Sequence, residues 1–221
     1  MTVIAPARTE LLPAGRRRVA LALLIPVGPL AVAVLRGILP YSTTDSSAQI
    51  VSKVAAHQGA EGLVLWLTLI ATYALIPGVI AVGLMAARSR PVLGTTALVL
   101  TVAGFLALPA VAVSDQVALS GVRLPTGSTI RLLDELAKQP TIVVSGAVFV
   151  VGHVLGILLL GIALWRIIPR WAALLLAVSQ PLHFTFAVIV PNHLLDGCAW
   201  TLTTIGFVMA ARSFILEKDS R

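Results

Sequence analysis

The chain has 221 residues, which is enough for one domain. Hydrophobic residues make up 58% of it and charged residues only 11%, whereas a soluble domain carries roughly 25% charged residues. So little charge cannot cover a water-facing surface, which excludes an ordinary soluble protein and indicates that lipid is the solvent for most of the surface. The expected fold is all-α: a polytopic membrane helix bundle of about six transmembrane helices, with two short amphipathic helices on its outer surface.

The formal net charge is +7, and a basic balance can indicate nucleic-acid binding. Here the Lys and Arg residues lie in short clusters between apolar stretches, with no basic face that carries interleaved aromatics. We therefore expect no nucleic-acid partner; the expected partners are the lipid bilayer and a second membrane protein or a second copy of the chain. The single cysteine, Cys198, excludes an intrachain disulfide and a cysteine-based metal site.

Six apolar stretches follow one another along the chain, and a helix needs about 20 residues to cross the bilayer. The first carries Pro26, Gly28 and Pro29, which predict a kink. It runs on almost to Leu39 without a convincing cleavage site, which favours a retained helix over a secretory signal peptide. The sixth is the shortest and reaches full length only if it begins near Asn192. The predicted spans are residues 19–35, 62–86, 92–113, 141–165, 171–190 and 198–211.

The distribution of basic residues predicts the orientation of these spans in a plasma membrane. With the N-terminus inside, 11 of the 16 Lys and Arg residues fall on inner segments and 5 on outer ones, the bias expected of cytoplasmic loops. Trp165 and Trp171 bracket one of the basic inner turns, as interfacial aromatics do. The predicted organisation is a cytoplasmic segment 1–18, a six-helix transmembrane domain 19–212 and a cytoplasmic tail 213–221.

The two long outer loops each contain an amphipathic pattern. In residues 45–57 the apolar side chains of Ile50, Val51 and Val54 share one side, and residues 128–139 repeat the pattern with a group of leucines. Both segments are predicted to be short helices that lie on the outer membrane surface or cap the bundle. Solvated loop helices packed against the bundle are the alternative.

Two histidines lie near the middle of predicted spans. Trp165 follows His153 by 12 residues and Trp171 precedes His183 by 12, so both imidazoles are expected about 18 Å from the shared inner turn. Two histidines at equal depth on adjacent antiparallel helices are the arrangement that ligates a b-type haem from both sides, and they would also suit a proton relay or a quinone site. The alternative is a pair of structural hydrogen-bonding residues.

Small residues accompany this histidine pair. Gly152 and Gly156 place a narrow face beside His153, which permits close approach of another helix or of a flat macrocycle. In the second span, Pro77 before Gly78 predicts a kink that can line a cavity.

A second constellation lies at the outer ends of the spans. His57 and Glu61 are four residues apart, and His193 and Asp196 are three apart, so each pair can share one helical face. Together they form a candidate zinc site. The alternative is that these are polar residues of the membrane edge, with Asp196 placed before a helix as a partner for its dipole.

Three functional hypotheses follow. The first is a non-enzymatic small transporter or accessory membrane subunit; the second is a b-type haem redox protein that uses His153 and His183. The third is a membrane-embedded enzyme acting on a lipid or isoprenoid, with Asp115, His193 and Asp196 as its available catalytic groups. No recognisable catalytic motif supports an enzyme, and no Asp or Glu falls in the middle of a predicted span, which counts against an acidic proton relay.

Overall fold

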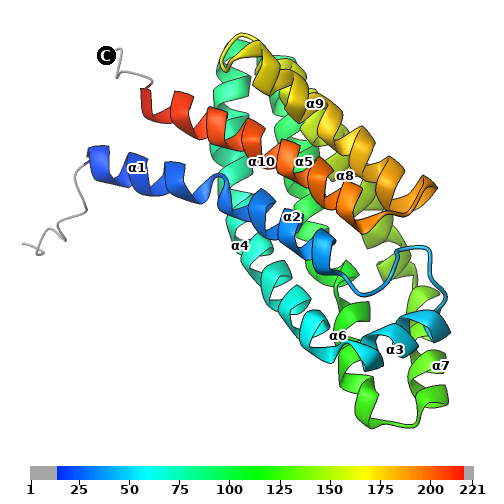
Figure 1. The fold of residues 1–221 in the computed structure, drawn as a ribbon. Helices are drawn as coiled ribbons and strands as arrows, with labels where there is room; N and C mark the ends of the chain where they lie inside the picture. Colours follow the sequence, from blue (N-terminus) through cyan, green and yellow to red (C-terminus); the bar gives the residue numbers. More distant parts are fainter. Residues whose placement is uncertain (1–13, 217–221) are drawn as a thin grey trace, which may run out of the picture.

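The computed structural model describes residues 14–216, and the regular secondary structure of this part of the chain is all helical, with no strand (Figure 1). A 3₁₀ turn, Gly121–Arg123, follows α6, and a π-helical turn, Thr185–Ile189, follows α9. The α-helices are α1 (Ala14–Leu24), α2 (Val27–Ile38), α3 (Ser47–Ala56), α4 (Gln58–Ser89), α5 (Pro91–Val111), α6 (Val113–Ser120), α7 (Thr126–Ala137), α8 (Pro140–Ala163), α9 (Arg170–Phe184) and α10 (His193–Leu216).

Six helical stretches within residues 14–216 are long and apolar enough to cross a membrane. The first combines α1 and α2, and the break between them at Pro26 confirms the predicted kink. The stretches are Arg18–Ile38, Gln58–Ser89, Pro91–Arg123, Pro140–Ala163, Arg170–Ile189 and His193–Leu216. Large apolar side chains cover their exterior, among them Trp66, Tyr73 and Val92, which are 66%, 74% and 83% exposed. Such a surface is suited to lipid as its solvent.

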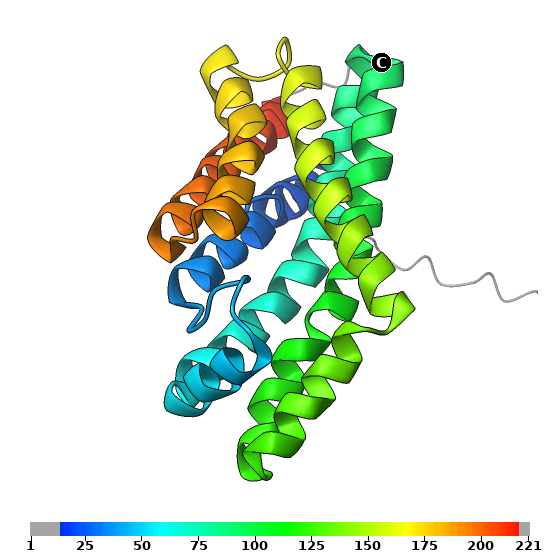
Figure 2. The same ribbon diagram turned by 90° about the vertical axis from the view of Figure 1, so that its right-hand side faces the viewer.

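The six long apolar helical stretches form a closed ring. Each contacts its neighbours in the order α2, α4, α5, α8, α9 and α10, and α10 returns to α2 (Figures 1 and 2). The first and last spans therefore lie side by side although they are the most distant in sequence. A polar side chain that points to the ring axis meets side chains from helices far apart in the chain.

The two ends of the ring differ in structure. One end carries α3, α6 and α7 (Figure 1), and we call it the loop-helix end. The opposite end carries the tight turns at Arg88–Arg90 and Arg166–Arg170, and we call it the basic end. Both predicted loop helices are confirmed, and Val51, Val54 and Leu133 bury their side chains in a small second core with Leu39. These helices therefore cap the bundle.

The α5–α8 pair is packed closely through glycines. A methyl group added to Gly152 would come within 2.7 Å of the Gly104 Cα on α5, which is closer than real side chains approach. The narrow face predicted beside His153 is thus covered by another helix, α5, and not by a flat macrocycle. This packing sets the position of His153 in the ring.

The third and sixth helical stretches extend furthest beyond their predicted ranges. The third stretch continues past Val111 through α6 to Arg123, although Asp115 and Gln116 lower its hydropathy. The sixth helix begins at His193, in agreement with the alternative start near Asn192 and not with Cys198, and Asp196 lies in its first turn. Charged residues do not end these two helical stretches, because Asp115 bonds to Tyr41, and Asp196 bonds to Arg36 and His183.

Candidate functional site

Three polar side chains from three helices meet inside the ring. Asp196 on α10 is fully buried, and its Oδ2 pairs with the guanidinium of Arg36 on α2. Its Oδ1 lies 2.5 Å from Nδ1 of His183 on α9. Buried charges are stable only when they are paired and hydrogen-bonded, and here both carboxylate oxygens have a partner. We call these three residues the triad.

The contacts of His183 assign its proton. Nδ1 lies between Asp196 and the indole Nε1 of Trp200, which is 3.1 Å away. One ring nitrogen cannot donate and accept at the same time, and a carboxylate is the stronger partner. Nδ1 therefore carries a proton and donates it to Asp196. Among the described residues, Nε2 of His183 has no hydrogen-bond partner.

His153 on α8 lies next to the triad. Its ring centroid is 5.4 Å from that of His183, which confirms the prediction that the two histidines share a depth. Its Nδ1 donates to the carbonyl of Phe149 at 2.5 Å, while its buried Nε2 has no partner within residues 14–216. The ring stacks on Phe149 with centroids 4.3 Å apart and lies 6.1 Å from Trp200. A neutral imidazole with a free Nε2 thus lies in an aromatic environment.

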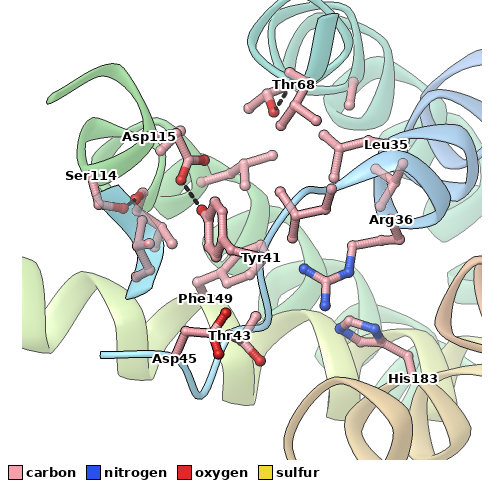
Figure 3. A pocket seen from close by; sticks show the side chains of 18 of the residues that line it. Leu35, Arg36, Tyr41, Thr43, Asp45, Thr68, Ser114, Asp115, Phe149 and His183 are labelled. Carbon is pink, nitrogen blue, oxygen red and sulfur yellow. Dashed lines mark hydrogen bonds between the residues drawn. The ribbon is translucent and has the colours of Figure 1, made fainter. Parts of the chain in front are cut away.

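A cavity of about 450 Å³ opens beside the triad, between α2, α4, α5 and the helices of the loop-helix end (Figure 3). Arg36 and His183 point toward it from one side and Tyr41 and Asp115 from the other. Most of the wall is apolar, including Phe105, Phe149, Trp200, Ala71 and Leu75, and its polar residues are Arg36, Tyr41, Thr43, Asp45, Ser47, Thr68, Ser114, Asp115 and His183. This combination of an apolar wall and a few polar groups is typical of small-molecule sites.

A second polar group lies where α4 and α6 meet. The hydroxyl of Tyr41 donates to Oδ1 of Asp115. The pKa of this hydroxyl is raised, mainly because the side chain is buried and next because of the negative charge of Asp115; Glu61 adds a smaller effect of the same sign. Glu61 is fully buried, and neither of its oxygens has a hydrogen-bond partner among residues 14–216.

The segment between α2 and α3 is held in place by its own polar contacts. Lys53 donates to Asp45 at 2.6 Å, and this hydrogen bond is the main reason that the pKa of Asp45 lies below its usual value. Thr43 donates to the carbonyl of Ala187 in the π-helical turn, which ties this segment to the end of α9. Such π-turns are frequent at functional sites.

The structure separates the residues of the predicted metal site. His57 is exposed and contacts the carbonyl of Lys53, Glu61 has no partner, and Asp196 belongs to the triad. Within residues 14–216, no group of three or more His, Cys, Asp or Glu side chains is placed to hold a metal ion. The candidate catalytic residues Asp115 and Asp196 are not brought together either. Asp115 is hydrogen-bonded to Tyr41, whereas Asp196 is hydrogen-bonded to His183.

Sequence reasoning missed three residues of the site. Arg36 was counted as an outer-loop charge, yet its side chain is 12% exposed and pairs with Asp196. Tyr41 and Trp200 were not singled out. The sequence feature that could have identified Arg36 is its position at the end of an apolar run. A charged side chain there must either reach the membrane surface or pair with a buried partner.

No protein-family model matches the chain, and no curated protein or solved structure matches it.

Proposed function

We propose that this chain is a non-enzymatic, multi-pass plasma-membrane protein, a small transporter or the accessory subunit of a larger membrane assembly, that holds a small molecule in the cavity beside the triad. The cavity carries the proposal, because a space of about 450 Å³ with an apolar wall and a few polar groups is what a small organic ligand needs.

The orientation belongs to the same proposal. The basic turns at Arg88–Arg90 and Arg166–Arg170 favour a cytoplasmic basic end, with both termini inside. The loop-helix end then faces outward, and the cavity lies between the spans near this end. A ligand would reach it from the outer side or from the outer leaflet of the bilayer.

The experiment compares wild-type protein with cavity-filling variants. Ala71 on α4 and Ala112 between α5 and α6 are buried and line the cavity, so Ala71→Phe and Ala112→Phe each fill part of it. Ala147→Phe places the same side chain on the exposed face of α8 and is the matched control. Each protein is purified in mild detergent, extracted with solvent and analysed by mass spectrometry.

The expected result is a compound at near-stoichiometric amount in wild type and in Ala147→Phe that both cavity-filling variants lose. Circular dichroism and size-exclusion chromatography show whether these variants keep the fold. Equal recovery of the compound from folded variants, or no compound above that in an unrelated membrane protein, contradicts the proposal.

A b-type haem protein is the second candidate, favoured by one observation. In both histidines Nδ1 is hydrogen-bonded to an acceptor: the carbonyl of Phe149 for His153, and Asp196 for His183. Nε2 of each ring has no hydrogen-bond partner among the described residues. This is the state in which a histidine ligates a metal, with the acceptor holding the ring in position. His153 and His183 would be the axial ligands of the iron, and the haem would supply one-electron redox chemistry.

The visible spectrum of the purified protein, oxidised and then reduced with dithionite, tests this candidate. Haem bound by the pair gives a Soret band that shifts on reduction and is lost in His153→Ala and His183→Ala but kept in His57→Ala, since His57 is exposed. A featureless spectrum from cells supplied with haem, or full haem in His153→Ala, contradicts it.

A further inference from the structure

The acidic and basic residues around the cavity do not balance. Arg36 pairs with Asp196, and Lys53 pairs with Asp45. Each of these two bases thus has one acid. Glu61 and Asp115 remain, and neither forms an ion pair within the part of the chain that the structure describes.

Glu61 is the more unusual of the two. Its side chain is fully buried, and both of its oxygens lack a hydrogen-bond donor among residues 14–216. A buried carboxylate without any partner is strongly unfavourable, so such a residue is either protonated or completed by a ligand. In either state Glu61 has hydrogen-bonding capacity that no described residue uses and that a ligand can fill.

Glu61 lies one helical turn before the part of α4 that lines the cavity. Val64, Thr68 and Ala71 line the cavity and follow Glu61 by three, seven and ten residues. This spacing keeps all four on one face of a helix. Glu61 thus stands at the loop-helix end of the same face that forms the α4 wall.

Asp115 reaches the same place from α6. It lines the cavity, accepts a hydrogen bond from Tyr41, and has no other donor among the described residues. Tyr41 packs in one buried cluster with Val64, three residues after Glu61, and with Ala118, three residues after Asp115, so both carboxylates lie one helical turn from this cluster. The acceptor capacity of the two carboxylates exceeds what one hydroxyl can satisfy.

The rest of the wall matches a compact organic body. Tyr41, Phe105, Phe149 and Trp200 contribute aromatic rings to the cavity. Aromatic faces attract organic cations as well as apolar groups. Arg36 lies on the other side of the cavity from Asp115. Its ion pair with Asp196 reduces its repulsion of a bound cation.

We propose that the cavity binds a small amphipathic organic cation, an amine with a compact apolar body, whose ammonium group lies between Glu61 and Asp115. The ammonium donates to both carboxylates, and its apolar body lies among the aromatic side chains. This inference rests on the proposed function, because it names the class of ligand for the same cavity.

The test uses two probes of nearly equal shape and opposite charge, adamantylamine and adamantane carboxylate. Their binding is measured by isothermal titration calorimetry with the full-length protein in lipid nanodiscs, after subtraction of the heat from empty nanodiscs. Glu61→Gln and Asp115→Asn keep the shape of each side chain and remove its charge. Asp134→Asn removes an exposed carboxylate on α7 and is the matched control.

Wild type and Asp134→Asn are expected to bind the amine at least about tenfold more tightly than the carboxylate. Glu61→Gln and Asp115→Asn are each expected to weaken amine binding by about tenfold or more, since each removes a charge-assisted hydrogen bond in a poorly solvated site. Because Glu61→Gln removes an unpaired buried charge, it is expected to fold at least as well as wild type.

Equal binding of the two probes, no amine binding above that of empty nanodiscs, or unchanged amine affinity in Glu61→Gln and Asp115→Asn overturns this inference. A neutral or anionic compound that co-purifies with wild type and is lost from Ala71→Phe would also overturn it while supporting the proposed function. Failure of the cavity-filling experiment contradicts the proposed function itself, so the two failures are distinguishable.

Discussion

Asp196 on α10 accepts a hydrogen bond from His183 on α9 at 2.5 Å and, through its second oxygen, pairs with Arg36 on α2. A single carboxylate thereby joins α2 to α9 and α10 and closes the ring of helices. Since Asp196 is fully buried, water cannot replace either partner. A buried polar network of this kind is stable when complete and costly when one member is lost.

Asp196→Asn is expected to lower the free energy of unfolding by about 3–5 kcal/mol, because it leaves the Arg36 guanidinium without its counter-ion in a poorly solvated place. Thermal unfolding in mild detergent, followed by circular dichroism, measures the effect. Asp134→Asn, at an exposed position, should match wild type. Replacing both partners, as in Arg36→Met with Asp196→Leu, should cost less than the single change; a larger loss would contradict the ion-pair explanation.

Gly152→Ala is expected to destabilise the bundle by roughly 1–3 kcal/mol, because its methyl group would press against the backbone of α5 at Gly104. Gly146→Ala, on the same helix, has no neighbouring atom within 4 Å of its added methyl group. This control should be neutral or slightly stabilising, since alanine favours a helix more than glycine does. Equal unfolding midpoints for the two variants would show that α5 and α8 are not packed as described.

Alkaline titration tests the burial of Tyr41. The pKa of its hydroxyl is raised above the ordinary tyrosine value of 10.0, first by burial and then by Asp115. The folded state therefore keeps this proton where the unfolded state loses it, so the contribution of Tyr41 to stability is present below pH 10 and is lost as the pH rises further.

Folded wild type and Tyr41→Phe are expected to give the same tyrosinate absorbance at alkaline pH, because Tyr41 does not ionise in the folded protein. After unfolding in denaturant, wild type should give the larger signal. A larger signal from folded wild type than from folded Tyr41→Phe would show that the hydroxyl is accessible and not bound to Asp115.

Reporter fusions test the orientation. A reporter joined after Arg90 or after Arg170 is expected to be active in the cytoplasm, and one joined after Lys138 on the outer side, because basic residues favour the cytoplasmic side of short loops. An enzyme reporter that works only outside the cytoplasm, paired with a fluorescent one that works only inside, measures both cases. The reverse pattern would place the cavity toward the cytoplasm.

Much of the local structure could be predicted from the sequence. The length of each apolar run sets the spans, and the 3.6-residue spacing of Ile50, Val51 and Val54 reveals the helix that became α3. The equal depth of His153 and His183 also followed from the helix rise alone. Each of these features depends on residues that are near one another in the chain.

The tertiary structure alone decided the composition of the site. Arg36 resembled a loop charge and Asp196 a residue in front of a helix, because a local pattern cannot show that a partner from a distant helix neutralises each of them. The order of helices in the ring, the aromatic wall of the cavity and the missing partner of Glu61 depend on which helix faces meet. Apolar surface drives chains of this kind into lipid without specifying those faces; close packing at glycines and the pairing of buried charges select them.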